Sequence, residues 1–300
     1  MTAHGAPSPG PGGPGRYPQL PLGLSGADVD ALTALAEAAA RAAGDLVRAG
    51  DGSRPSVAST KSSPTDVVTA MDRASERLLR DFLAERRPDD GLLGEEEAGL
   101  RAGTTGLTWV LDPIDGTVNY LYRIPAYAVS VAVVTGDPRV PGAWAPVAGC
   151  VHHVVTEQTW TAGLGGGARA DGVAVRLEPL ADDLAHALVG TGFGYRPARR
   201  AAQARVFAEI APQVRDVRRI GSAALDMCAV ADGRLDLYYE RGLNVWDLAA
   251  ATLVVTEAGG TVSGLQGRPL GDRTVIAGAE GLCAQLEPLL VAAGADADGV

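Results

Sequence analysis

The sequence is poor in cysteine and in aromatic residues. Among 300 residues there are three cysteines, and only 5% of the residues are aromatic. Cys150, Cys228 and Cys283 are widely spaced, odd in number and form no CxxC pair. This pattern excludes a disulfide framework. It favours three small buried side chains in a reducing cytosol.

Long apolar runs and a targeting leader are also missing. No stretch reaches the ~18 apolar residues that a membrane span requires. The N-terminus has neither the basic start nor the apolar core of a signal peptide. We therefore expect a cytoplasmic protein that makes no membrane contact. Residues 1–25 are rich in proline and glycine, which predicts a disordered tail.

An excess of positive charge is absent as well. The formal net charge is −10, which argues against nucleic acid or an anionic membrane surface as the main partner. An acidic protein can still bind an anionic ligand when a cation bridges the two. A metal ion is the usual bridge, so the acidic residues themselves become the candidates for a site.

The chain does contain enough apolar sequence for a large core, since 46% of its residues are hydrophobic. Apolar spacing predicts helices over residues 27–48, 66–86, 197–212, 222–231, 246–258 and 280–293. Strands are predicted over residues 92–94, 108–112, 126–134, 146–155, 157–163, 186–193 and 234–240, and in the short runs TVSG and TVIAG. Because helices and strands are mixed throughout, the predicted class is α/β or α+β with layered sheets. We expect one domain of two lobes over residues 26–294.

The motif WVLDPIDGTVNY at positions 109–120 ends an apolar strand on two aspartates, Asp112 and Asp115. Pro113 fixes its own φ and keeps the preceding residue extended. Gly116 permits a sharp bend, and Thr117 can begin a helix. Such a turn can aim both carboxylates, and a carbonyl between them, into one volume. A bare DxxDGT would favour a simple Asx-type turn, whereas LDPIDGT as a whole favours a site.

Several carboxylates share this kind of position at strand ends, turns or helix starts. They are Asp72, Glu95, Glu96, Asp112, Asp115, Glu240 and Asp247. If they converge, their mutual repulsion requires compensation, and hard divalent cations with oxygen ligands supply it. Taken singly, two features have simpler interpretations. Glu95 to Glu97 can be a solvated acidic face, and Asp247 can stabilise a helix start.

Three blocks in this order resemble the inositol monophosphatase family of magnesium-dependent, lithium-sensitive phosphatases. They are GEE (94–96), WVLDPIDGTVNY (109–120) and WDLAAATLVVTEAGG (246–260). KSSPTDVVTAMDRASE (61–76) and RRIGSAALDMCAVADGRLDLYYE (218–240) match further family blocks. The stretches IPAYAVSVAV, VGTGFGYRP and VRRIGSAALD look closest to the bacterial SuhB-type branch, whose members are usually inositol-1-monophosphatases. The resemblance covers roughly residues 28–290 and implies a layered αβαβα sandwich and commonly a homodimer.

The resemblance also implies roles for single residues. The ligands of a first Mg²⁺ match Glu95, Asp112 and the carbonyl of Ile114. Those of a second Mg²⁺ match Asp112, Asp115 and Asp247, and a weaker third ion lies beside Glu95. The positions that orient the attacking water match Asp72, Glu96 and Thr117. The substrate-binding positions match Asp115, Gly116, Thr117, Ala223, Glu240 and Asn244, of which the last stands where many relatives have histidine.

The chemistry of the acidic set agrees with these roles. A phosphate monoester is inert, and two metal ions ~3.5–4 Å apart can clamp both the attacking and the leaving oxygen. We hypothesise that Thr117, linked to Asp72, takes or orients the proton of the attacking water. Glu96 assists, and no covalent intermediate forms.

The expected substrate is inositol monophosphate, a small phosphorylated polyol. Histidinol phosphate, fructose 1,6-bisphosphate and 3′-phosphoadenosine 5′-phosphate remain open. Glu240 suits a ligand with hydroxyls or an amine and would repel a second phosphate. An alternative outside catalysis is a regulatory partner of RNA polymerase, which would not need the metal ligands that are all present here.

Overall fold

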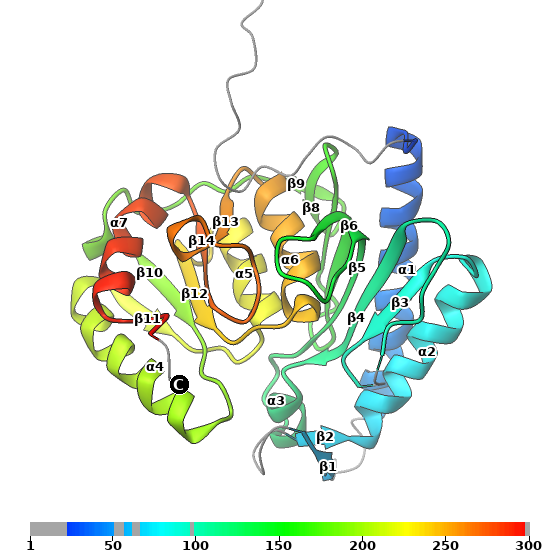
Figure 1. The fold of residues 1–300 in the computed structure, drawn as a ribbon, viewed down its shortest axis with the longest axis horizontal. Coiled ribbons are helices and arrows are strands. Elements are labelled where there is room, and N and C mark those ends of the chain that lie inside the picture. Colours follow the sequence, from blue (N-terminus) through cyan, green and yellow to red (C-terminus); the bar gives the residue numbers. More distant parts are fainter. Residues whose placement is uncertain (1–22, 51–56, 62–66, 97–98, 298–300) are drawn as a thin grey trace, which may run out of the picture.

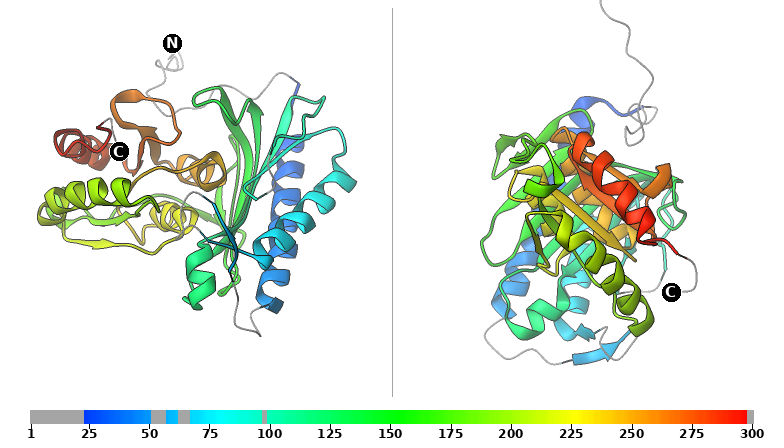
Figure 2. Two further views of the ribbon diagram at one scale, coloured as in Figure 1. Left: turned by 60° about the horizontal axis from the view of Figure 1, so that its bottom comes forward. Right: turned by 90° about the vertical axis from the view of Figure 1, so that its left-hand side faces the viewer.

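The helices and sheets stack in five layers, α–β–α–β–α, which Figures 1 and 2 show from three directions. The computed structural model describes residues 23–50, 57–61, 67–96 and 99–297. The predicted layered αβαβα sandwich is therefore confirmed. Most of the predicted disordered tail, residues 1–22, lies outside the described residues, and the domain boundary stays a prediction.

The first two layers are a pair of helices and a seven-stranded sheet. Helices α1 (Gly26–Ala49) and α2 (Ala70–Arg86) cover one face of this sheet. Its strands, in spatial order, are β3 (Gly91–Gly94), β4 (Leu107–Asp115), β5 (Ala128–Gly136), β6 (Trp144–His153), β7 (Thr159–Gly163), β8 (Gly167–Ala170) and β9 (Val173–Val175). Among the described strands of this sheet, only β3 and β4 pair in parallel, so the ends of these two strands lie side by side.

The middle layer consists of α5 (Ala223–Ala231) and α6 (Val245–Glu257). Beyond it lies a five-stranded sheet, in the order β11 (Asp216–Arg218), β10 (Leu188–Thr191), β12 (Leu237–Arg241), β14 (Thr274–Gly278) and β13 (Thr261–Gly264). Helices α4 (Pro197–Ile210) and α7 (Glu280–Ala292) cover its outer face. Outside the layers are the short helix α3 (Thr117–Tyr122) and a two-stranded ribbon of β1 (Val57–Thr60) and β2 (Val67–Thr69).

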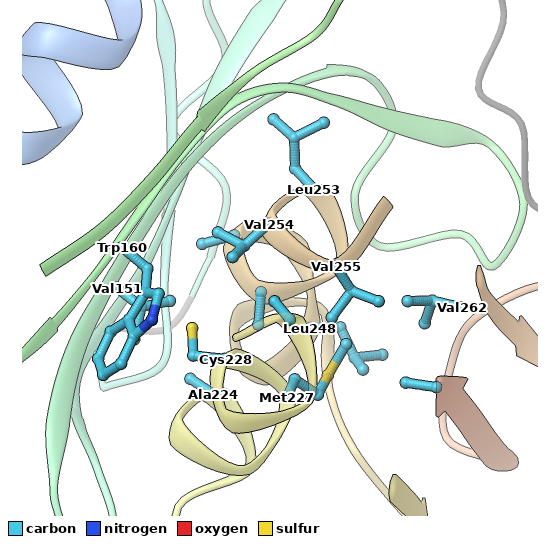
Figure 3. Close-up of a cluster of buried hydrophobic side chains, with 14 of the residues drawn as sticks. Val151, Trp160, Ala224, Met227, Cys228, Leu248, Leu253, Val254, Val255 and Val262 are labelled. Atoms are coloured by element: carbon cyan, nitrogen blue, oxygen red, sulfur yellow. The ribbon is translucent and has the colours of Figure 1, made fainter. Parts of the chain in front are cut away.

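Three hydrophobic clusters fill the spaces between the layers. The central one joins both sheets through α5 and α6, and Figure 3 shows Trp160 and Val151 of the first sheet beside Cys228 of α5. Helix α5 is buried along its whole length and α6 is buried from Leu248 to Val255, which agrees with the largely apolar sequences of these segments. The three cysteines are buried and unpaired, as predicted.

Several predicted segments differ from the structure at their ends. The predicted strands over 186–193 and 234–240 are strands only at Leu188–Thr191 and Leu237–Arg241. Two further differences lie beside the site. The predicted helix over 66–86 begins only at Ala70, because residues 67–69 pair with β1 and Thr69 caps α2 by accepting from the N–H groups of Met71 and Asp72. The predicted strand over 108–112 continues to Asp115, because the chain beyond Pro113 returns to pair with β5. No helix among the described residues combines the length and the apolar character needed to cross a bilayer.

Close packing of β6 on α6 sets the position of the helix that bears Asp247, and it gives a first prediction. A Cβ added to Gly149 would stand 2.9 Å from the Cα of Ala250. We expect Gly149→Ala to lower stability by about 1–3 kcal/mol, since backbone must move to admit the methyl group. In a domain of this size each kcal/mol corresponds to roughly 2–4 °C in melting temperature.

The matched control is Gly281→Ala on α7, where nothing lies within 4 Å of the added Cβ. This change should be neutral or slightly stabilising, since alanine favours helix over glycine by about 1 kcal/mol. Thermal unfolding of the two variants measures the difference. Equal melting temperatures would show that the β6–α6 contact is not close-packed.

Candidate active site

A cavity of about 480 Å³ opens where β3 and β4 end and where α3, α5 and α6 begin. Most of the predicted site residues line it. They are Glu95, Asp112, Ile114, Asp115, Gly116, Thr117, Ala223, Glu240, Asn244 and Asp247. Asp72 and Glu96 do not line the cavity but contact residues that do, Thr117 and Lys61 respectively.

The two aspartates of the LDPIDGT motif flank a bulge in β4. Asp112 pairs with Ser130 and Asp115 with Ala128, so Pro113 and Ile114 are looped out of the ladder. The Ile114 N–H donates to Asp112 Oδ1 at 3.0 Å, and the Ser75 hydroxyl donates to the Pro113 carbonyl. The bulge allows two carboxylates from one strand to face the same cavity.

Gly116 makes the turn from β4 into α3 possible. Its φ is +101°, a left-handed value that favours glycine, and a Cβ there would lie 2.9 Å from the Ala126 carbonyl oxygen. The turn places the Thr117 hydroxyl 2.8 Å from Asp72 Oδ1, to which it donates. The same hydroxyl lies 3.1 Å from the Ile114 carbonyl oxygen. Burial raises the pKa of Asp72, and hydrogen bonds from Thr69 and Thr117 oppose that rise.

Glu95 and Glu96 follow β3 directly, at the edge where β4 delivers Asp112. The Glu95 N–H donates to the Leu111 carbonyl, and the Lys61 ammonium contacts Glu95 at 2.8 Å and Glu96 at 2.5 Å. Burial raises the pKa of Glu96 to about 7 although Lys61 lowers it. Burial alone would lower the pKa of Lys61, but the two glutamates outweigh it and the pKa rises. The simpler interpretation of a fully solvated acidic face does not hold for these two residues.

Asp247 reaches the same cavity from the first turn of α6. Its Oδ2 accepts from the Asn244 N–H at 2.6 Å, so the predicted helix-start role and a site role coexist. One oxygen from each of Asp112, Asp115 and Asp247 lies within 4.8 Å of the other two. Burial, and then the charges of Glu95, Asp115 and Asp247, raise the pKa of Asp112 well above its usual value. For Asp247, burial and the charges of Glu95 and Asp115 do the same.

This donor set fits a hard divalent cation. Three carboxylates in a low-dielectric cavity repel one another, and no cationic side chain of the described residues forms an ion pair with Asp112, Asp115 or Asp247. Oxygen-only ligands of this kind are those that Mg²⁺ and similar ions prefer. The roles of single residues as ligands stay predictions.

Helix α5 anchors Asp115 in a way that the sequence did not reveal. The Ser222 hydroxyl and the Ala224 N–H both donate to Asp115 Oδ2, at 2.6 and 2.7 Å. Ser222 lies 107 positions from Asp115 along the chain, so no local sequence pattern could show this contact. Both bonds are to Oδ2, so the other carboxylate oxygen of Asp115 accepts neither of them.

The rim of the cavity bears the predicted substrate contacts. The Tyr238 hydroxyl donates to Glu240 Oε2 at 2.5 Å. Burial raises the pKa of Glu240 to about 7, against the hydrogen bond from Tyr238 and the charge of Arg219. Asn244 is exposed and Ala223 is buried at the start of α5. Tyr238 is thus a further candidate residue that the motifs did not indicate.

Comparison with known proteins shows which family shares the sequence and the fold of this chain. The sequence pattern of the inositol monophosphatase family matches residues 28–293. The chain is 52% identical to an inositol-1-monophosphatase of Mycobacterium leprae over 73% of this chain and 74% of that one. It is 35% identical to the Nus factor SuhB of Escherichia coli over 78% and 85% of the two chains.

Similarity in three dimensions agrees. The structure of Mycobacterium tuberculosis SuhB superposes with a TM-score of 0.74 at 42% identity, covering 89% of this chain and 98% of that one. The family match and the superposed fold thus both extend over most of the chain. The chain belongs to the inositol monophosphatase family.

Proposed function

We propose that this chain hydrolyses inositol 1-phosphate to inositol and phosphate. The observation that supports it most is the convergence of Glu95, Asp112, Asp115 and Asp247 beside the Thr117–Asp72 pair in one cavity. The 52% identical relative named inositol-1-monophosphatase supports the substrate. Within the cavity, Glu240 and Asn244 offer acceptors and donors for polyol hydroxyls.

The proposed cofactor is Mg²⁺, with two or three ions per site. Glu95, Asp112 and the Ile114 carbonyl would hold one ion, Asp112, Asp115 and Asp247 a second, and Glu95 would lie beside a third. When bound, such ions neutralise the phosphate and make water a stronger nucleophile at neutral pH.

The side chains around the proposed cation sites orient the attacking water and its proton. The Thr117 hydroxyl donates to Asp72, so its lone pairs are available to accept a hydrogen bond from the attacking water. Glu96, held by Lys61, assists in orienting that water. The backbone N–H groups of Gly116 and Thr117, at the turn into α3, are the proposed donors to the substrate phosphate.

Tyr238 should act on substrate affinity rather than on the chemical step. Because its hydroxyl orients Glu240, Tyr238→Phe should raise KM for inositol 1-phosphate by roughly 3–10-fold, the effect of about one lost hydrogen bond, with kcat within ~2-fold. Para-nitrophenyl phosphate, which has no polyol hydroxyls, should keep its KM. The exposed Tyr122 supplies the control variant Tyr122→Phe. Equal KM changes for both substrates would refute a role through Glu240.

A substrate panel tests the proposed function as a whole. Purified protein with Mg²⁺ is assayed against inositol 1-phosphate, histidinol phosphate, fructose 1,6-bisphosphate and 3′-phosphoadenosine 5′-phosphate, comparing kcat/KM. We expect inositol 1-phosphate to be hydrolysed and chelation of the metal to abolish turnover. Absence of hydrolysis across the panel would overturn the enzymatic proposal.

A second candidate function follows from the relatives named Nus factor SuhB, which are 34–36% identical to this chain. A binding role in transcription would not require a complete set of metal ligands, and the complete set favours catalysis. Recovery of a stable RNA polymerase complex by a variant without phosphatase activity would support the second role. Nucleic acid is not proposed as a direct partner because the net charge is −10.

We further propose that the protein is a cytoplasmic homodimer, as the family resemblance implies. Light scattering coupled to size-exclusion chromatography measures the mass directly. A mass near 30.7 kDa, that of one chain, would refute the dimer.

A further inference from the structure

Helix α2 presents a buried polar face toward the two segments that carry proposed cation ligands. Asp72, Ser75 and Glu76 follow one another at positions i, i+3 and i+4, so their side chains lie on the same face of the helix. All three residues have an exposed fraction of 0%. Helix α2 packs on β4, and Figure 1 shows it along the β3–β4 side of the first sheet. Polar side chains buried in such a place require hydrogen-bond partners.

Two residues of this face hold the backbone of the candidate site. The Ser75 hydroxyl donates to the Pro113 carbonyl, in the bulge of β4, at 3.1 Å. The Glu76 carboxylate reaches the segment that follows β3, where its Oε2 accepts from the Glu96 N–H at 2.7 Å. One helix therefore contacts both segments, and it does so through side chains that do not line the cavity.

The backbone on both sides of the Glu95 side chain is anchored. The Glu95 N–H donates to the carbonyl of Leu111 in β4, the residue before Asp112. The next N–H, that of Glu96, turns away from the sheet to Glu76 on α2. Because β4 holds one peptide and α2 holds the next, the place of the Glu95 carboxylate relative to Asp112 is set by these two contacts.

Arg80 and Gly94 keep the Glu76 carboxylate in place. The Arg80 Nε donates to Glu76 Oε1 at 2.8 Å from one helical turn further along α2. A Cβ at Gly94 would lie 2.2–2.6 Å from the atoms of the Glu76 carboxylate. The φ of Gly94 is not positive, so space for this carboxylate, rather than backbone conformation, explains the glycine that begins the GEE block.

The burial of the Glu76–Arg80 pair indicates that it does more than join two turns of a helix. An exposed i, i+4 ion pair contributes little, whereas here the side chain of Glu76 is 0% exposed and that of Arg80 is 16% exposed. Removing two charges from water is unfavourable unless further hydrogen bonds compensate for it. The bond from the Glu96 N–H is such a contact, and hydrogen bonds to a charged carboxylate are short and strong.

We propose that Glu76 is a positioning residue of the active site. By accepting from the Glu96 N–H it places the Glu95 carboxylate beside Asp112, and so it sets the affinity of the cation that Glu95 and Asp112 would bind. Groups that orient the ligands of a metal ion typically change its affinity by about 10–100-fold when they are replaced. The inference rests on the proposed metal-dependent function and deepens it with a residue that acts through Glu95.

The test compares two double variants that both remove the buried ion pair but differ in the acceptor at position 76. Glu76→Gln with Arg80→Met keeps an amide oxygen for the Glu96 N–H, whereas Glu76→Leu with Arg80→Met offers no acceptor. Because both charges are removed together, neither protein contains an unpaired buried charge from this pair. Thermal unfolding checks that each variant folds.

Mg²⁺ alone is the first probe. When Mg²⁺ is titrated into the protein without substrate in a calorimeter, one of the bound ions should have a dissociation constant about 10-fold or more above the wild-type value in the Glu76→Leu protein. In the Glu76→Gln protein it should stay within ~3-fold, because the acceptor is kept.

Turnover of inositol 1-phosphate is the second probe. In the Glu76→Leu protein the Mg²⁺ concentration for half-maximal rate should rise about 10-fold or more, while kcat at saturating Mg²⁺ returns to within ~3-fold of the wild type. A residue that only stabilises the fold would lower the melting temperature without moving the Mg²⁺ dependence.

Asp236→Asn is the matched control. Asp236 is also a buried carboxylate that accepts from backbone N–H groups, those of Leu180, Ala181 and Leu188, but it does not line the cavity. This change should lower the melting temperature, because the three N–H groups lose a charged acceptor, and should leave the Mg²⁺ dependence within ~2-fold.

Gly94→Ala disturbs the same contact while Glu76 and Arg80 remain. The added methyl group would displace the Glu76 carboxylate, so this variant should also weaken Mg²⁺ binding about 10-fold. It decides the question if the Glu76→Leu protein does not fold.

Two outcomes would overturn the inference. One is unchanged Mg²⁺ binding in the Glu76→Leu protein, or in Gly94→Ala where the former does not fold. The other is an equal loss in both double variants, since the ion pair and not the acceptor would then matter. A protein that binds Mg²⁺ but hydrolyses no inositol 1-phosphate refutes the proposed function alone, and the titration without substrate still decides the role of Glu76.

Discussion

Replacing Asp112 with asparagine should abolish turnover and at the same time raise the melting temperature of the metal-free protein. Asp112 is buried among Glu95, Asp115 and Asp247, all of the same charge. Asparagine keeps the oxygen that accepts from the Ile114 N–H but removes the charge. The metal-free fold should therefore gain about 1–2 kcal/mol, which corresponds to roughly 2–8 °C.

The same change should cost at least about 10³ in kcat/KM, because loss of charge at a cation site removes several kcal/mol of transition-state stabilisation. Thermal unfolding with chelator and with Mg²⁺ separates the two effects. In the wild type Mg²⁺ should raise the melting temperature by mass action, and in Asp112→Asn this increase should be largely lost.

Asp90 provides a matched control at the start of β3. It is also a buried aspartate, but Arg87, Thr105 and the Trp109 indole all donate to it. Asp90→Asn should lower the melting temperature, because partners are left unsatisfied, and should leave kcat within ~2-fold. A metal-free Asp112→Asn that melts lower than the wild type, as Asp90→Asn should, would contradict the picture of a repelling cluster.

The local part of the site could be predicted because one short segment contains it. Asp112, Asp115, Gly116 and Thr117 lie within six residues, and the requirements for a bulge and a left-handed turn can be seen in the Pro and Gly between them. Glu95 and Asp247 were candidates because of their positions at a strand end and a helix start, and the family resemblance then made them partners of the two aspartates. The structure brings all of them to one cavity.

The contacts that hold these residues could not be predicted, since they join distant parts of the chain. Lys61 lies 35 positions from Glu96, and Ser222 lies 107 positions from Asp115. The start of α2 was predicted four residues too early because residues 66–69 continue its apolar spacing, although the Thr69–Asp72 pair marks the true start.

The Thr117–Asp72 pair should prove to act as one unit in the chemical step. Thr117→Val removes the hydroxyl and keeps the shape, so kcat should fall about 10²–10³-fold while KM stays within ~3-fold. Thr117→Ser should retain most of the rate. Asp72→Asn should also lower kcat, since its Oδ1 no longer accepts from Thr117 as a charged group.

The double variant distinguishes a shared role from two separate ones. If Thr117 passes or orients a proton only through Asp72, the combined loss should be close to the larger single loss rather than the product of both. Thr252→Val on α6 is the control, since its buried hydroxyl has no hydrogen-bond partner among the described residues and its removal should keep kcat unchanged. A multiplicative loss would mean that Asp72 acts by capping α2 through Thr69, and that Thr117 orients the water without it.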